Sequence, residues 1–524
     1  MKRPRLIIAL TCFALAYAGS VFYVFGPEAR DRDQPPPRVT IRFGHWQLET
    51  GLREAFDVVA RRYMELHPDV RVEQLAVPGA VYKQWLSTQL AGGTVPDLVS
   101  FDFADQALVA QVPRHFEVLT RWLEEPNPYN AGTPLEGMAW KDTFIDRGRN
   151  RVTYLDQYRN FFAVGLCSHT MRMFYNRDLM REITGSPEPP RNFREWLALG
   201  EKVRAHRPGL AHVAGSRDFY GWLMPSLVNQ SLGRWIGRRD YGLRFGTTTF
   251  DFYGDFLAGQ WDLRSPEMQQ ALRIAQAFGR EMPSGFLQVD RNAALQSFLR
   301  GEALCVPSGT WDFPTMRATA SFAIGGYRLP LPAADDPEFG GLALLPVSDG
   351  GASTALPFFL TRQSAHKAEA LDFLRFVTSM EGNRLFSAAS QWMPAIEGVP
   401  VAPELEPFRQ VTDGYIATDA QSGPILMAGP GAEGARLLTT HYHLLFAPDG
   451  GVDAFTRSVE DRMRPAVMAD LQQQLNLGRA NLRRRDTALG AQWFLGPAEQ
   501  ADMLRQVTGQ HLVEVQVALL ARRL

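Results

Sequence analysis

Cysteine is scarce in this 524-residue sequence, which contains only Cys12, Cys167 and Cys305. The three are far apart, so there is neither a Cys-x-x-Cys pair nor another spacing typical of metal ligands. Cys12 lies in an apolar N-terminal segment, whereas the other two lie in strand-like apolar runs. We therefore expect buried thiols, because free cysteine packs like a small hydrophobic residue. A disulfide between Cys167 and Cys305 stays open as the alternative in an oxidising compartment.

An excess of charge of one sign is also missing. The 55 basic and 56 acidic residues give a formal net charge of -1 and are interspersed along the chain. No broad electropositive face for nucleic acid is therefore expected. The charge balance fits a neutral small ligand better than a polyanion.

The sequence lacks the common catalytic motifs as well. It has no Gly-x-Ser-x-Gly elbow, no His-Glu-x-x-His helix and no Gly-rich phosphate loop followed by Lys and Ser or Thr. His441 and His443 could touch one metal, but such an isolated pair is more often structural. We therefore predict neither an enzyme nor a cofactor or metal site. Glycoside hydrolysis by paired carboxylates stays open as an alternative, because 56 acidic residues bring some pairs close together in any fold.

The N-terminus indicates export. Three basic residues among the first five precede an almost unbroken apolar run over residues 6–25, which is typical of a secretory signal or a signal anchor. A cleavage site follows Ala18, yet the run continues past it, and about 20 apolar residues can span a bilayer. We predict residues 1–26 to be a signal peptide or a membrane anchor and the Pro-rich residues 27–37 to be a linker. The protein should then lie in the periplasm or on the outer face of the cytoplasmic membrane.

The exported part alternates short β-branched or aromatic runs with amphipathic stretches, a pattern that predicts α/β architecture with largely parallel sheets. Loops at the carboxyl ends of such strands are where open α/β sheets bind ligands, and Trp46 and Asp102 occupy two of these positions. The first expected strands are residues 39–43, 70–75 and 96–102, with helices at 51–67 and 81–90 between them. Later strands are expected at 162–167 and 172–175, around a turn, and at 301–307 and 354–361, with helices at 193–204, 220–232, 265–278, 292–299 and 364–378.

A succession of motifs resembles the family of extracellular solute-binding proteins that includes maltose-type and other oligosaccharide receptors of ABC importers. None of these motifs is specific alone, and the resemblance depends on their order from residue 41 to residue 459. The motifs are Ile41-Arg42-Phe43-Gly44-His45-Trp46, Val95-Pro96-Asp97-Leu98-Val99, Met173-Phe174-Tyr175-Asn176-Arg177-Asp178-Leu179, Gly309-Thr310-Trp311, the helix over residues 367–376, and Val452-Asp453-Ala454-Phe455.

The resemblance implies a type II periplasmic-binding-protein fold, with two lobes that each contain a mostly parallel sheet flanked by helices and that are joined by a hinge. Lobe 1 would comprise residues 38–161 and 353–398, and lobe 2 residues 162–352 and 399–475. Residues 476–524 extend beyond the family's usual end and are predicted to be a helical extension.

The function implied by the resemblance is that of a non-catalytic, monomeric receptor. It would capture a small hydrophilic solute, a sugar or oligosaccharide in the first place, by hinge closure. It would then deliver the solute to the permease subunits in the membrane.

Sugars present polar edges and apolar C–H faces, so their receptors need aromatic platforms together with carboxylate or amide groups. Trp46, Asp102 and Trp311 lie at strand exits that match the family's ligand loops. Trp85 and Trp196 are expected in the core, where tryptophan on a helix or strand is usually found. The complete set of predicted ligand-binding residues is Trp46, Glu49, Tyr82, Asp102, Phe103, Tyr220, Trp222, Trp311 and Trp392.

A second function stays open, that of a membrane-tethered sensor or scaffold that uses the same fold. The apolar N-terminus and the tail favour it, because residues 476–485 are polar and Arg-rich and residues 497–524 show helical apolar spacing. Such a tail could pack on the body or bind a partner.

Overall fold

The computed structural model describes residues 38–101, 108, 111–150, 153–155, 158–221, 223, 227, 231–233, 235, 249–343, 349, 353–412, 433–495 and 500–524. The predicted signal or anchor, the linker and Cys12 lie outside these residues. Within them, no helix combines the length and apolarity needed to cross a membrane. Cys167 and Cys305 are free and buried, which confirms the expectation of buried thiols.

Lobe 1 is built on a six-stranded sheet in the order β12-β6-β11-β3-β1-β2. Its strands are β1 (Val39–His45), β2 (Val70–Ala76), β3 (Leu98–Ser100), β6 (Ala163–Ser168), β11 (Thr354–Leu360) and β12 (Met393–Pro394). β1 pairs in parallel with β2 and β3, whereas β11 and β12 pair antiparallel to their neighbours. The sheet is mixed rather than mostly parallel, because β11, which returns from lobe 2, and β12, which follows α15, run against the direction of β1, β2, β3 and β6.

Helices cover both faces of this sheet. Along β11, Phe358 and Leu360 enter the core that contains α2 (Leu52–Leu66), α14 (Lys367–Val377) and α15 (Met380–Ser390), whereas Phe359 enters the core under α3 (Gly79–Gly92). This alternation follows from the two-residue period of a strand. Shorter elements border the lobe: α5 (Val112–His115), α6 (Thr120–Leu123), η1 (Pro128–Asn130), η2 (Trp140–Thr143), β4 (Tyr154–Leu155) and β5 (Asn160–Phe161).

Lobe 2 is built on a four-stranded sheet in the order β10-β7-β9-β8. Among its described strands, only β8 and β9 pair in parallel. After β7 the Asn176 side chain accepts hydrogen bonds from the backbone N–H of Asp178 and Leu179 and thereby begins α7. The elements are β7 (Met171–Asn176), α7 (Arg177–Thr184), α8 (Phe193–His206), β8 (Ala211–Val213), α10 (Thr249–Leu257), α11 (Pro266–Gly279), η3 (Phe286–Gln288), α12 (Arg291–Leu299), β9 (Ala303–Gly309), η4 (Thr310–Asp312), α13 (Phe313–Thr319), β10 (Ile324–Tyr327), η5 (Pro403–Phe408), α16 (Glu433–His441), α17 (His443–Phe446), α18 (Val452–Leu495) and α19 (Gln500–Arg523).

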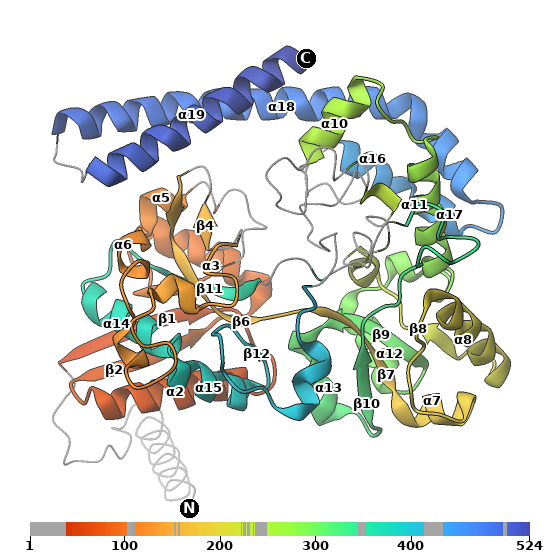
Figure 1. Cartoon of the computed structure of the whole chain (residues 1–524), viewed down its shortest axis with the longest axis horizontal. Coiled ribbons are helices and arrows are strands. Elements are labelled where there is room, and N and C mark those ends of the chain that lie inside the picture. The colour runs from red at the N-terminus through yellow and green to blue at the C-terminus, as the bar shows by residue number, and fades with distance from the viewer. Residues whose placement is uncertain are drawn as a thin grey trace, which may run out of the picture.

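The first crossing between the lobes lies at residues 169 and 170, where β6 leads into β7 (Figure 1). The expected boundary after residue 161 falls before β6, but β6 pairs with β11 from Ala163 to Ser168 and therefore belongs to the sheet of lobe 1. β6 and β7 are thus strands of two different sheets, not a hairpin within lobe 2. Arg172, which is fully buried just after the crossing, donates to the carbonyls of Pro407 and Arg409 and pairs with Asp349. It thereby ties the first crossing to the segment that returns to lobe 2.

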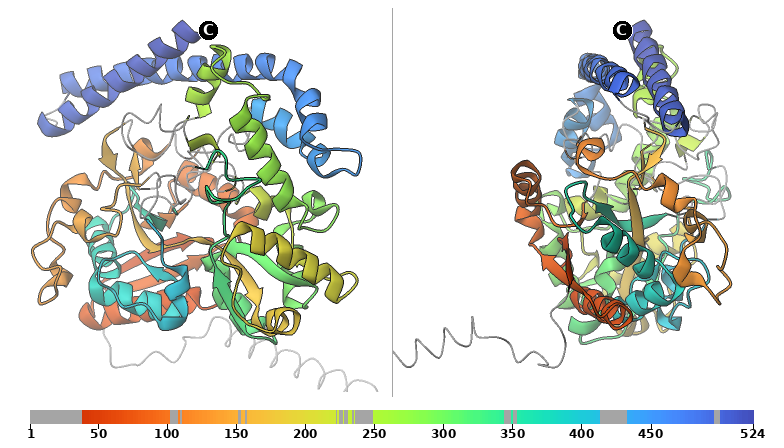
Figure 2. Two further views of the ribbon diagram at one scale, coloured as in Figure 1. Left: turned by 45° about the vertical axis from the view of Figure 1, so that its right-hand side comes forward. Right: turned by 90° about the vertical axis from the view of Figure 1, so that its left-hand side faces the viewer.

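The C-terminal region forms a long helical hairpin of α18 and α19. Phe455, Val459, Met463, Val467 and Leu471 of α18 are fully buried in the core of lobe 2. The predicted extension after residue 475 continues this helix without a break as far as Leu495, and α19 packs back on it. Figures 1 and 2 show the hairpin lying across both lobes.

Candidate functional site

Four chain segments meet where the two lobes join. They are the β1–α2 loop, the β6–β7 crossing, the turn after β9, and the residues between α15 and β12. The indole N–H of Trp392 donates to the carbonyl oxygen of Trp311 at 3.3 Å, and the backbone N–H of Thr50 donates to the hydroxyl of Thr315 at 3.4 Å. These hydrogen bonds join lobe 1 to lobe 2. We call this region the interlobe junction.

The β1–α2 loop places Trp46 beside α3. Trp46 is half-buried, and its ring centroid lies 5.3 Å from that of Tyr82. Tyr82 is buried and donates from its hydroxyl to the carbonyl of Gly44 at 3.1 Å. The Tyr82 hydroxyl therefore holds the end of β1, where the loop begins, against α3, while part of the Trp46 side chain stays accessible to solvent.

Three of the buried polar atoms without a protein partner belong to segments of the junction. Oε1 of Gln47, Oε2 of Glu49 and Nδ1 of His169 have no hydrogen-bond partner among the described residues. An unpaired buried polar atom costs about 1–3 kcal/mol, so native proteins usually satisfy such atoms with water or a ligand. The three atoms are therefore available for hydrogen bonds to water or to a bound molecule.

The charge state of these groups follows from their burial. Burial raises the pKa of Glu49, reinforced by the charge of Asp312, while nearby backbone N–H groups and Arg291 oppose the shift. Burial also lowers the pKa of His169 to about 3, so its imidazole is neutral near pH 7. Its ring lies edge-on to Trp311 and Trp392, at centroid distances of 5.3 and 4.5 Å. The junction therefore combines a neutral imidazole with two indoles.

The turn after β9 holds Trp311 and Asp312 in fixed positions. Asp312 accepts hydrogen bonds from the Ser308 hydroxyl at 2.5 Å and from Arg291. A Cβ atom at position 309 would lie 2.1 Å from the indole of Trp311. Glycine at this position therefore allows the indole to fold back over the end of β9.

The predicted site residues are distributed unevenly. Glu49, Trp311 and Trp392 lie at the junction, and Trp46 belongs to the same loop as Glu49. Tyr82 supports that loop. Tyr220 lies in the core of lobe 2, where its hydroxyl donates to the carbonyl of Ala275 at 3.1 Å. Three further predictions, Asp102, Phe103 and Trp222, lie outside the described residues.

Sequence reasoning did not identify Gln47, His169 or Asp312 as site residues. His169 directly follows β6, so a correct placement of the first crossing would have pointed to it. The Gln47 and Asp312 side chains carried no motif signal, although each is one residue from a predicted tryptophan.

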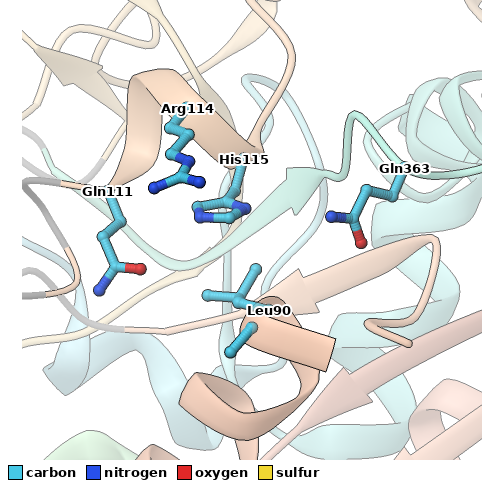
Figure 3. Close-up of a pocket in the computed structure, with 6 residues that line it drawn as sticks. Leu90, Gln111, Arg114, His115 and Gln363 are labelled. Atoms are coloured by element: carbon cyan, nitrogen blue, oxygen red, sulfur yellow. The ribbon is translucent and has the colours of Figure 1, made fainter. Parts of the chain in front are cut away.

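A separate recess of about 460 Å³ lies on lobe 1, between the end of α3 and α5 (Figure 3). Arg114 and His115 project toward it from α5, and Leu90 lines it from α3. None of its lining residues belongs to the four segments of the interlobe junction. It shares no group with the unpaired polar atoms described above.

The family model described as "Bacterial extracellular solute-binding protein" matches residues 49–384. An uncharacterised ABC transporter extracellular-binding protein from Pyrococcus horikoshii is 20% identical over 370 residues, which cover 68% of this chain and 72% of that protein.

Solved structures share the fold at low sequence identity. The apo form of RafE from Streptococcus pneumoniae has a TM-score of 0.55 at 18% identity, covering 83% of this chain and 99% of that one. The cyclic α-maltosyl-1,6-maltose binding protein from Arthrobacter globiformis has a TM-score of 0.54 at 16% identity, with coverage of 83% and 99%. The maltotriose-bound MalE domain from Bdellovibrio bacteriovorus has a TM-score of 0.52 at 14% identity, with coverage of 83% and 100%. The chain therefore has the two-lobed type II fold of these binding proteins.

Proposed function

The chain belongs to the family of bacterial extracellular solute-binding proteins, and we propose that it captures a sugar or oligosaccharide between its two lobes for an ABC importer. As a member of this family it is a binding protein rather than an enzyme. The name of the Pyrococcus relative supports the importer assignment. The RafE, maltose-type and chitin-oligosaccharide binding proteins among the structural neighbours support a carbohydrate ligand.

The observation that carries the proposal is the pairing of indoles with unsatisfied polar atoms at the interlobe junction. Trp311 and Trp392 flank His169, and unpaired atoms of Gln47 and Glu49 lie in the adjoining loop. An indole face fits the C–H face of a sugar ring, and carboxylate and amide groups fit its hydroxyls. These groups would supply both kinds of contact that a sugar requires.

Binding would be coupled to a hinge movement. Groups at the junction come from both lobes, so a ligand that contacts all of them stabilises the closed arrangement over the open one. The closed form would deliver the solute to the permease subunits in the membrane. We further propose that the protein acts as a monomer and is exported, with residues 1–26 serving as signal peptide or anchor.

A thermal-shift screen tests the proposal directly. Raffinose, maltotriose, chitin oligosaccharides, polyols, amino acids and polyamines are added in turn, because a ligand that binds only the folded state raises Tm. We expect a shift with at least one carbohydrate. A shift with amino acids or polyamines alone, or no shift with any class, would contradict the assignment.

Site variants then locate the ligand. Trp46→Ala and Trp311→Ala should weaken binding of the carbohydrate, whereas Trp493→Ala, at a side chain that is 73% exposed near the end of α18, provides the control. Equal affinity in all three variants would place the ligand elsewhere.

The exposed hairpin favours a second candidate, the membrane-tethered sensor or scaffold. Trp493 and Phe494 are 73% and 85% exposed, and large exposed apolar side chains in a cluster often mark interaction sites. A photoreactive group at residue 494 separates the two candidates in intact membranes. Crosslinking to a permease subunit supports the receptor, and crosslinking to a histidine kinase supports the sensor.

A further inference from the structure

The α18–α19 hairpin is anchored in lobe 2 by the first half of α18. The first half of α18 buries five apolar side chains in the core of that lobe, from Phe455 to Leu471. Asp470 on the same stretch accepts hydrogen bonds from the backbone N–H of Glu433 and Gly434 at the start of α16. This half of the helix therefore moves with lobe 2 as one body.

The second half of α18 is stiffened by α19. Gln510 donates to Asp486, and Arg485 donates to the carbonyl of Gln506 at 3.5 Å. Gly478 lies so close to Val517 that an added Cβ would come within 2.7 Å of that side chain. The two helices thus form a paired arm instead of a single exposed helix.

The far part of this arm contacts lobe 1. The guanidinium carbon of Arg485 lies 4.7 Å from the centroid of the Tyr158 ring, which is the geometry of a cation–π contact. Tyr158 follows β4 and packs edge-on against Phe162, a buried residue of the lobe 1 core. Both partners are half-buried, so the contact is better shielded from water than a fully exposed pair.

The contact depends on how the lobes are arranged. Arg485 lies 26 residues beyond Val459 on one helix, or about 39 Å along its axis at 1.5 Å per residue. A rotation of lobe 1 about the crossings displaces Tyr158, while Arg485 stays fixed relative to lobe 2. The contact is therefore made only in arrangements close to the one described.

We propose that the α18–α19 hairpin is a strap that fastens lobe 2 to lobe 1 through Arg485 and Tyr158 and so shifts the hinge equilibrium toward this arrangement. The proposal rests on the receptor function, since it concerns the movement that surrounds the ligand. It assigns a role to the residues that extend past the end of the family match at residue 384 and past the lobe 2 core.

The distribution of interlobe distances in the unliganded full chain tests the strap. Spin labels are placed at Arg61→Cys on α2 and Glu201→Cys on α8, both exposed, in a Cys12→Ser background, and distances are measured by double electron–electron resonance in detergent. Two populations are compared: arrangements that make the Arg485–Tyr158 contact and arrangements that lack it. Tyr158→Leu and Arg485→Gln should each change the ratio of these populations by about twofold to fivefold, the range for a cation–π contact near a surface. The shifts should not add in the double variant, because both changes remove the same Arg485–Tyr158 contact.

Two matched variants control the experiment. Tyr158→Phe keeps the ring, and Arg479→Gln removes an exposed charge from the same helix, so both should give the parent distribution. Identical distributions in the parent, Tyr158→Leu and Arg485→Gln would overturn the strap. Because no ligand is present, this result would leave the receptor function standing, whereas failure of the carbohydrate screen would leave the strap measurement intact.

Discussion

Replacing Gly309 by alanine should displace the Trp311 side chain, although the new methyl group itself would not contact the ligand. Gly309 has φ −76° and ψ 152°, a conformation that alanine adopts freely. The new methyl group, however, would lie 2.1–2.2 Å from three atoms of the Trp311 indole. Ordinary van der Waals contact between carbon atoms requires about 3.5–4.0 Å. The ring must therefore move by more than an ångström, or the end of β9 must distort.

The size of the effect depends on whether the end of β9 distorts or the Trp311 indole moves. Overpacking of this kind costs about 1–3 kcal/mol of unfolding free energy. If the indole swings away instead, the ligand loses one apolar platform. A contact of about 1.5–3 kcal/mol, the range for burying a large apolar side chain, corresponds to about a ten- to hundredfold increase in Kd.

Titration calorimetry with the carbohydrate found in the screen, combined with urea unfolding, measures both effects. Gly341→Ala is the matched control, because a Cβ at position 341 meets no atom within 4 Å and the backbone there has no positive φ. If Gly309→Ala binds and unfolds like Gly341→Ala, then the indole of Trp311 does not lie against position 309.

Two further predictions concern stability. Burial holds the pKa of His169 at about 3, whereas an unfolded histidine titrates near 6.5; the unfolded state therefore binds the extra proton, and stability falls as pH drops from about 6.5 toward 3. Between pH 7 and pH 4, the free energy of unfolding of His169→Gln should fall by up to about 3 kcal/mol less than that of the parent, as measured by urea unfolding. Parallel pH profiles of the two proteins would refute the reasoning. In α18, Leu471→Ala should lower the unfolding free energy by about 2–5 kcal/mol, while Leu477→Ala, at a side chain that is 48% exposed, should change it by less than about 0.5 kcal/mol. Equal effects of the two leucine changes would show that the first half of α18 is not rooted in lobe 2.

The local pattern of lobe 1 was predictable from sequence because each element there carries its own periodicity. The expected helix at 51–67 is α2 (Leu52–Leu66), and the expected strand at 70–75 is β2 (Val70–Ala76). The assignment of strands to lobes was not predictable in the same way. β6 and β7 are both buried almost throughout, and the sequence of a strand that is buried on both faces does not reveal which sheet it joins.

The candidate site was predictable where it depends on aromatic residues at strand exits. Trp46 directly follows β1, and Trp311 is the second residue after β9; such positions are visible in the sequence. The roles of Gln47 and His169 depend instead on burial without a partner, which arises only when distant segments pack together. Residues 476–524 were predicted to be a helical extension, but the unbroken connection of their Arg-rich part to the helix of lobe 2 was not predicted, although arginine is a good helix former on an exposed surface.

Because α18 is one continuous helix, the protein should tolerate few changes in its length. Inserting one residue between Leu475 and Arg485 would turn everything beyond it by about 100° around the helix axis and carry it about 1.5 Å further along. Arg485 would then point away from Tyr158 even though its own neighbours in sequence were unchanged. A seven-residue insertion would nearly restore the direction but overshoot by about 10 Å. Point substitutions should therefore be widely tolerated on the exposed side of this stretch, whereas insertions and deletions should be rare among sequences that retain the arm.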